Sequence, residues 1–121
     1  MVYNPTPAPT VVQDDTVVYS AAAPVAWTDL DLSAAIGARA CMVILQIRNL
    51  EAAVTCAYRF RQNGDIGVYT NLSGISNLDT INQGTMGDVL VRTDAAGIVE
   101  WIANADRNTA VCVKAYWHAP G

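Results

Sequence analysis

From Thr16 onward the chain consists of short strand-forming runs separated by turn-forming residues. No window of helical length combines apolar residues at helical spacing with capping residues. The runs fall at residues 16–20, 25–32, 40–50, 54–61, 66–70, 86–92, 98–103 and 109–117. Short strands with regular turn signals are typical of all-β proteins. We therefore predict a single-domain β-sandwich or jelly roll of about 7–8 strands, with almost no helix.

Two of these runs indicate how their side chains face. In residues 54–61 apolar side chains alternate with positions that include Arg59 and Arg61, so one face is expected in the core. Residues 40–50 are apolar on both faces, which is typical of a central strand covered on both sides. The glycine-rich stretch 65–85 is expected to be a long loop with one short strand, and long loops are often functional.

Composition excludes several classes of function. The chain has 121 residues, enough for one domain, with 52% hydrophobic and 15% charged residues. Such a chain is not disordered. Eleven acidic residues against seven basic ones argue against binding to a phosphate backbone, so no nucleic-acid partner is expected.

The sequence also bears on compartment. The first residues lack the charged and apolar regions of a signal peptide, and the longest apolar run is too short for a membrane helix. We expect synthesis in the cytoplasm and no membrane partner. Three cysteines without a Cys-x-x-Cys pair favour buried, reduced thiols over disulfides or zinc.

We find no catalytic, cofactor-binding or metal-binding motif, and therefore predict a protein that is not an enzyme and needs no cofactor or metal. The lone histidine, His118, has no partner in sequence for a catalytic unit. Glu100 lies in a strand beside Trp101 and is expected to pair with an arginine on a neighbouring strand. Asp29 and Asp31 share a strand face, but a calcium site needs further ligands.

Residues 1–15 differ from the sandwich domain expected at 16–121. Pro5, Pro7 and Pro9 alternate with other residues, which predicts an extended arm rather than a helix. The alternatives are a frayed terminus and an arm that lies on a neighbouring subunit. Low charge, a single lysine and strand edges without protecting charges favour the second alternative, and with it a homo-oligomer.

Three segments carry a resemblance to small β-sandwich virion proteins of tailed bacteriophages. They are residues 27–47, residues 58–65 (Tyr-Arg-Phe-Arg-Gln-Asn-Gly-Asp) and residues 91–101 (Val-Arg-Thr-Asp-Ala-Ala-Gly-Ile-Val-Glu-Trp). The resemblance covers roughly residues 25–117 and consists of strand and turn patterns. It implies a virion component, most simply a capsid decoration (cement) protein. Such a protein would be a trimer or dimer that binds the major capsid protein or another virion protein.

No catalytic residue carries over from that resemblance. We expect the arm, the long loop and three arginines to contact the partner. The predicted contact residues are Tyr3, Pro5, Pro7, Val11, Val12, Arg59, Arg61, Asn71, Leu72 and Arg92.

Three alternatives remain open at this point. The first is a tail or fibre subunit. The second is a carbohydrate- or receptor-binding module, which would need at least two exposed, coplanar rings among Trp27, Tyr69, Trp101, Tyr116 and Trp117. The third is a small hydrolase, in which Glu100 would face another carboxylate across a cleft.

Overall fold

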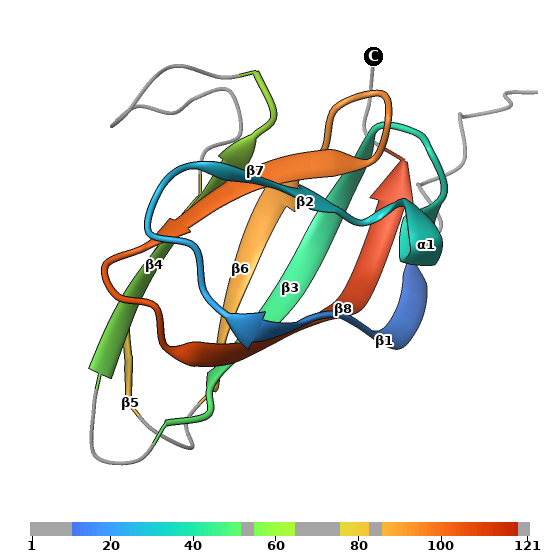
Figure 1. Cartoon of the computed structure of the whole chain (residues 1–121). Helices are drawn as coiled ribbons and strands as arrows, with labels where there is room; N and C mark the ends of the chain where they lie inside the picture. The colour runs from blue at the N-terminus through green and yellow to red at the C-terminus, as the bar shows by residue number, and fades with distance from the viewer. Residues whose placement is uncertain (1–10, 52–54, 65–75, 83–85, 119–121) are drawn as a thin grey trace, which may run out of the picture.

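The computed structural model describes residues 11–51, 55–64, 76–82 and 86–118 (Figure 1). Within these residues the chain forms eight strands and one short helix. In chain order they are β1 (Val12–Ala22), β2 (Thr28–Asp31), α1 (Ser33–Ile36), β3 (Cys41–Asn49), β4 (Thr55–Gln62), β5 (Ser76–Asn82), β6 (Met86–Arg92), β7 (Ile98–Ala103) and β8 (Asn108–His118).

The strands form two antiparallel four-stranded sheets packed face to face (Figure 1). Sheet A has the order β1-β8-β3-β6, and sheet B has the order β2-β7-β4-β5. The pairs are nested along the chain: β1 with β8, β2 with β7, β3 with β6, and β4 with β5. A long two-stranded ribbon that folds over on itself has this pairing, which is the jelly-roll arrangement. The predicted all-β sandwich of jelly-roll type is confirmed.

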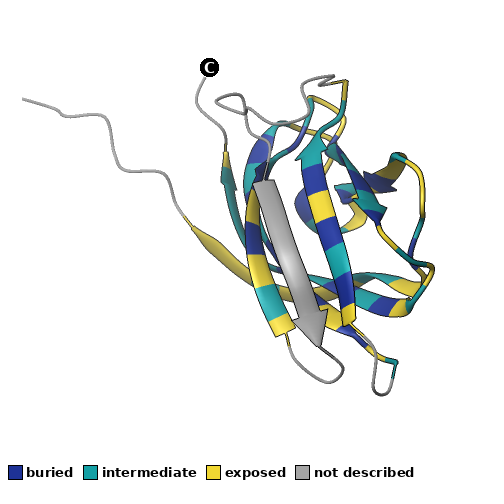
Figure 2. Cartoon of the chain, turned by 90° about the vertical axis from the view of Figure 1, so that its left-hand side faces the viewer, coloured by how far each residue is buried: buried dark blue, intermediate teal, exposed yellow. Residues whose placement is uncertain are grey.

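The core lies between the two sheets and follows the two-residue period of the strands (Figure 2). Its largest side chain is Trp101, of which only 1% is exposed. The Trp101 ring meets Tyr19 edge-on at a centroid distance of 4.8 Å and stacks near Tyr58 and Phe60 at 6.3 and 5.6 Å. Because Tyr19 belongs to sheet A and the other three to sheet B, this aromatic cluster joins the sheets.

The turn between β6 and β7 is held by one carboxylate. Asp94 Oδ1 accepts hydrogen bonds from the backbone N–H groups of Ala96 and Ile98 at 2.8 and 2.9 Å, and Oδ2 accepts one from Asn63 Nδ2 at 2.8 Å. Partial burial by itself raises the pKa of Asp94, but these hydrogen bonds outweigh it and hold the pKa below its ordinary value. The turn predicted at residues 93–97 is thus formed, with Asp in its usual role.

A lowered carboxylate pKa makes stability depend on pH in a known direction. The contribution of Asp94 is present above the ordinary pKa of 3.8 and is lost as the pH falls below it. We expect Asp94→Asn to lower the free energy of unfolding at pH 7 by about 1 kcal/mol. Between about pH 5 and pH 3 this variant should lose less stability than the wild type. Urea titrations across this range measure the effect, with Asp106→Asn as a control in an exposed connection. Parallel pH profiles for the wild type and Asp94→Asn would contradict the assignment.

Three details differ from the sequence prediction. The paired strand β1 begins at Val12, four residues before the expected start of the sandwich, because residues 12–22 pair with β8. The stretch expected to be one long loop contains β5, which pairs with β4, so that part of the prediction was wrong. One helical turn, α1, lies in the connection where no helix was expected. The arm residues 1–10 and the strand predicted at 66–70 lie outside the described residues.

Candidate functional site

The outer face of sheet A departs most from what the sequence suggests. Strand β3 was predicted to be covered on both sides, but among the described residues only one side is covered. Its inward side chains are fully buried, whereas Met42, Ile44 and Gln46 on the other side are only half-buried. No element that the structure describes packs over them: both sheets are four strands wide, and sheet B covers the inner face (Figure 1). A strand with a two-sided apolar sequence therefore has one side open.

The strand registers place further apolar side chains beside these. Leu90 of β6 and Ala115 of β8 lie on either side of Ile44, and Trp117 of β8 lies beside Met42. Leu90 is 45% exposed. We call the outward residues of sheet A the A face; its apolar members are Val17, Met42, Ile44, Met86, Leu90, Ala110, Cys112, Ala115 and Trp117. A contiguous apolar surface of this kind usually marks an interaction site.

The A face also carries charges of both signs. Lys114 forms an ion pair with Asp15 on β1, and the hydrogen bond to Asp15 raises the pKa of Lys114 above its ordinary value. On the other side, Asp88 lies on β6 and Arg48 on β3, with Arg92 at the end of β6. Apolar side chains bordered by charged groups are typical of a protein–protein interface.

The outer face of sheet B carries a different arrangement. Glu100 and Arg61 pair at 3.4 Å, as predicted from the sequence, and the Glu100 carboxylate also accepts the backbone N–H of Gly64 at 3.0 Å. The Arg61 guanidinium lies 3.8 Å from the centre of the Trp27 ring, so it covers one face of the indole. Arg61 is thus engaged within the chain, with 11% of its side chain exposed.

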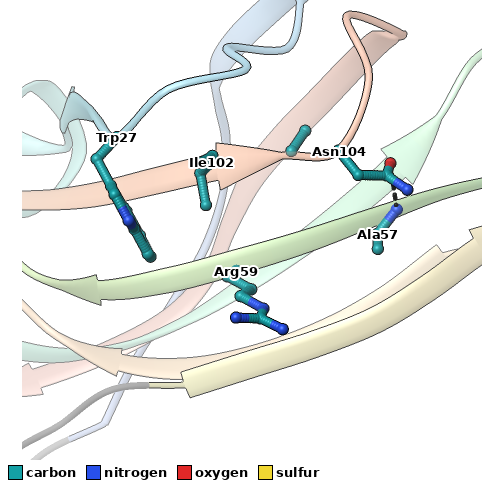
Figure 3. Close-up of a pocket in the computed structure, with 6 residues that line it drawn as sticks. Trp27, Ala57, Arg59, Ile102 and Asn104 are labelled. Carbon is teal, nitrogen blue, oxygen red and sulfur yellow. Dashed lines mark hydrogen bonds between the residues drawn. The ribbon is translucent and has the colours of Figure 1, made fainter. Parts of the chain in front are cut away.

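Beyond Trp27 the sheet B surface forms a hollow of about 250 Å³ (Figure 3). It is lined by Trp27, Ala57, Arg59, Ile102, Ala103 and Asn104. The register places Ile102 beside Arg59 in the row next to that of Glu100 and Arg61. Asn104 Oδ1 accepts the N–H of Ala57 at 3.1 Å, which orients the amide at the edge of the hollow.

The predicted contact residues do not gather on one surface. Arg59 lines the sheet B hollow, Arg61 pairs within the chain, and Arg92 lies on the A face. Val11 and Val12 are exposed, although Val12 already belongs to β1. Tyr3, Pro5, Pro7, Asn71 and Leu72 lie outside the described residues.

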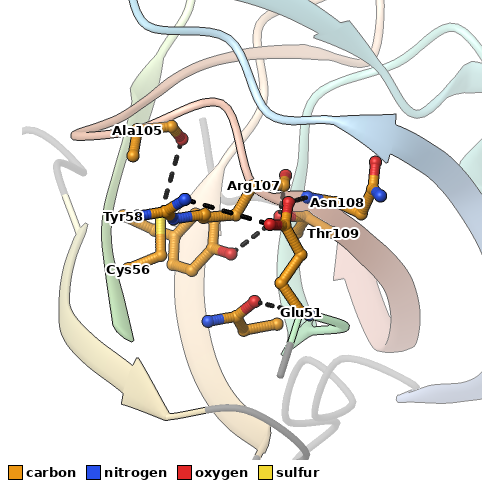
Figure 4. A network of polar contacts seen from close by, with 8 residues as sticks. Glu51, Cys56, Tyr58, Ala105, Arg107, Asn108 and Thr109 are labelled. Carbon is orange, nitrogen blue, oxygen red and sulfur yellow. Dashed lines mark hydrogen bonds and ion pairs between the residues drawn. The ribbon is translucent and has the colours of Figure 1, made fainter. Parts of the chain in front are cut away.

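A polar network lies at the end of the sandwich where β8 begins (Figure 4). Glu51 Oε2 accepts the N–H of Asn108 at 2.6 Å, and Glu51 Oε1 lies 3.9 Å from the Arg107 guanidinium. The Tyr58 hydroxyl is 2.7 Å from Thr109 Oγ1, which joins sheet B to sheet A. Burial raises the pKa of Tyr58, so the phenol stays protonated. Each of these groups stabilises a connection at this end of the sandwich, so we interpret the network as structural.

The other residues considered for chemistry are dispersed. Among the described residues no group of three His, Cys, Asp or Glu side chains comes together as a metal site would require. His118 Nε2 lies 2.9 Å from Arg39 Nη1 at an exposed position. The register sets Asp29 opposite Glu100, but on an open sheet face where Glu100 is paired with Arg61. The described part of the chain contains no helix long and apolar enough to cross a bilayer.

The cysteines and tryptophans are also separated. Cys41 and Cys56 are buried free thiols, as predicted, whereas Cys112 is half-buried on the A face, where burial raises its pKa. Trp101 is in the core, while Trp27 and Trp117 lie on the outer faces of opposite sheets. Within the described residues, the rings named for a sugar platform therefore do not form one.

The A face is the surface that sequence reasoning missed. Its signal was present, because residues 40–50 are apolar on both sides, but the sequence does not say whether the second side is covered by the same chain or by another.

Comparison with known proteins places the chain in no family. No family model matches it, and no curated protein matches it. A chain in a solved structure described as "Bacillus endospore appendages form a novel family of disulfide-linked pili" is similar at a TM-score of 0.47 and 14% identity. That match covers 100% of this chain and 98% of the other. A likeness this distant assigns neither a family nor a function.

Proposed function

We propose that this protein is a structural subunit of a virion, and more specifically a capsid decoration (cement) protein. It would act by binding rather than by catalysis. The observation that carries the proposal is the A face, an apolar sheet surface bordered by charged groups that no described element of the chain covers. A low charged fraction of 15% agrees with a chain whose surface is largely shared with other subunits.

The A face suits contact with a second copy of the same chain. It holds Asp15 and Asp88 together with Arg48, Arg92 and Lys114. A surface with both signs of charge among apolar side chains can be complementary to itself, as a symmetric interface requires. Such a homo-oligomer would bind the major capsid protein or another virion protein and add many weak contacts over a repeating shell.

The resemblance to small virion proteins of tailed phages supports the finer part of the proposal. A jelly roll also occurs in viral capsid domains, although the fold is shared with unrelated functions. A tail or fibre subunit would use the same surfaces, so it remains the alternative. Electron microscopy of particles assembled with and without the protein separates the two, because a decoration protein adds density over the shell.

The first test is the mass of the protein in solution by light scattering at several concentrations. We expect the wild type to be a dimer or trimer and Leu90→Arg to be a monomer, because arginine places an unpaired charge on the A face beside Ile44. Leu50→Arg is the matched control: Leu50 is 44% exposed, as Leu90 is 45%, but it lies in the β3–β4 connection.

Circular dichroism should show that both arginine variants keep the fold, since both positions are exposed. A wild type that is monomeric at every concentration, or a Leu90→Arg variant that assembles like Leu50→Arg, would contradict the role of the A face.

A further inference from the structure

We propose that the Trp27 hollow on sheet B receives the Pro-rich segment 3–9 of a neighbouring copy of this chain. The inference rests on the proposed function, because it supplies a second contact between subunits. It assigns an occupant to the hollow lined by Trp27, Arg59, Ile102 and Asn104.

The chemistry of the hollow matches an extended proline segment. Arg61 covers one face of the Trp27 indole, and the hollow opens toward the adjacent row, which contains Ile102. Prolines in an extended left-handed helix pack well on aromatic and apolar surfaces, and their preset conformation lowers the entropic cost of binding. Backbone carbonyls in that helix are solvated rather than bonded internally. The side-chain N–H groups of Arg59 and Asn104 are suitable donors for them.

The size and charge of the hollow also favour an uncharged peptide segment as its occupant. A volume of about 250 Å³ is below the range of roughly 300–1,000 Å³ typical of small-molecule pockets. One or two side chains of an extended peptide would fill it. Residues 1–10 contain no acidic or basic side chain, which suits a hollow whose lining carries a single charged side chain, Arg59.

The length of the chain favours a segment from another copy. Strand β1 has 11 residues, and at about 3.3 Å per residue its ends are ~33 Å apart. The hollow lies near the end of β1 at Ala22, since Ala103 N donates to Pro24 O at 2.8 Å. The arm joins at the other end, Val12 (Figure 1). Tyr3, at the far end of the segment, precedes Val12 by nine residues, which span at most about 32 Å even when fully extended, and the path must also round the sandwich.

A direct binding measurement tests this without requiring assembly. The protein is the full chain with Pro5→Ala, Pro7→Ala and Pro9→Ala, so that its own arm competes little, and the probe is a peptide of residues 1–12. We expect the peptide to shift the indole N–H signal of Trp27, which is assigned by Trp27→Phe, in NMR spectra of the full chain. A peptide with the same three alanines should not shift it. No shift with the wild-type peptide would overturn the inference.

The second measurement is the dissociation constant of the assembled wild type. Ile102→Glu, which fills the hollow with a charge, and the triple proline variant should each weaken association by about tenfold, and their combination should weaken it little further. Trp27→Ala is the second hollow variant, and Ala95→Glu is the control in an exposed turn at the far end of β7. If the triple proline variant weakens association but Ile102→Glu and Trp27→Ala do not, the inference is overturned, because the arm would then bind elsewhere.

These outcomes are separable from failure of the proposed function. If the wild type and Leu90→Arg are both monomeric but the peptide shifts Trp27, the hollow is an arm site and the A face proposal fails. If Leu90→Arg dissociates the assembly but the peptide leaves the Trp27 signal unchanged, the A face is the subunit interface and the hollow is not an arm site. A shift produced by neutral oligosaccharides and not by the peptide would make the hollow a sugar site and overturn the inference.

Discussion

Replacing Gly97 with alanine is expected to lower the free energy of unfolding by about 3 kcal/mol or more. Gly97 has φ +81°, a conformation that costs an L side chain energy wherever it occurs. In addition, a Cβ at this position would lie 2.6 Å from the carbonyl oxygen of Gly37. That oxygen belongs to the backbone, so the clash is relieved only by moving the connection that contains α1. The hydrogen bond from Leu32 N to Gly97 O, 2.9 Å long, would move with it.

Gly64→Ala is the matched control for that loss. Gly64 also has a positive φ, +88°, but a Cβ there would meet nothing within 4 Å. It therefore isolates the backbone strain, and we expect a loss of only about 1 kcal/mol. Urea-induced unfolding followed by far-ultraviolet circular dichroism measures both. Equal losses for the two variants would show that the close approach to Gly37 is not a significant cost.

The second large effect is expected for Trp101→Ala, at about 4 kcal/mol. The substitution removes the largest core side chain and the contacts that join Tyr19 of sheet A to Tyr58 and Phe60 of sheet B. Because the loss approaches the total stability of many small domains, Trp101→Phe provides a milder variant that keeps one ring in place. We expect Trp101→Phe to lower the free energy of unfolding by less than half as much as Trp101→Ala. Its near-ultraviolet circular dichroism signal should be reduced.

Trp117→Ala is the matched control for Trp101→Ala, since Trp117 is half-buried on the A face rather than in the core. Both variants are best compared in the Leu90→Arg background, where association does not add to stability. There we expect Trp117→Ala to cost about 1 kcal/mol. If Trp117→Ala costs as much as Trp101→Ala, the A face is covered even in the monomer and its role as an interface fails.

Local sequence determined much of this structure. The alternation in residues 54–61, the Asp94 turn and the pairing of Glu100 with an arginine all arise from contacts between neighbouring residues or strands, and each could be predicted. Strand β5 was missed because a short strand in a glycine-rich stretch has little periodic signal; its pairing with β4 defines it.

The tertiary structure alone decided where the surfaces lie. The sequence of residues 40–50 determined that both sides of this strand would be apolar, but only the sheet order shows that the described strands cover one of them. Likewise the sequence contains Trp27, Arg59 and Ile102 far apart, and only the register of β2, β7 and β4 brings them round one hollow. The physical reason is that side-chain patterning depends on local period, whereas the surface left uncovered depends on which distant strands pair.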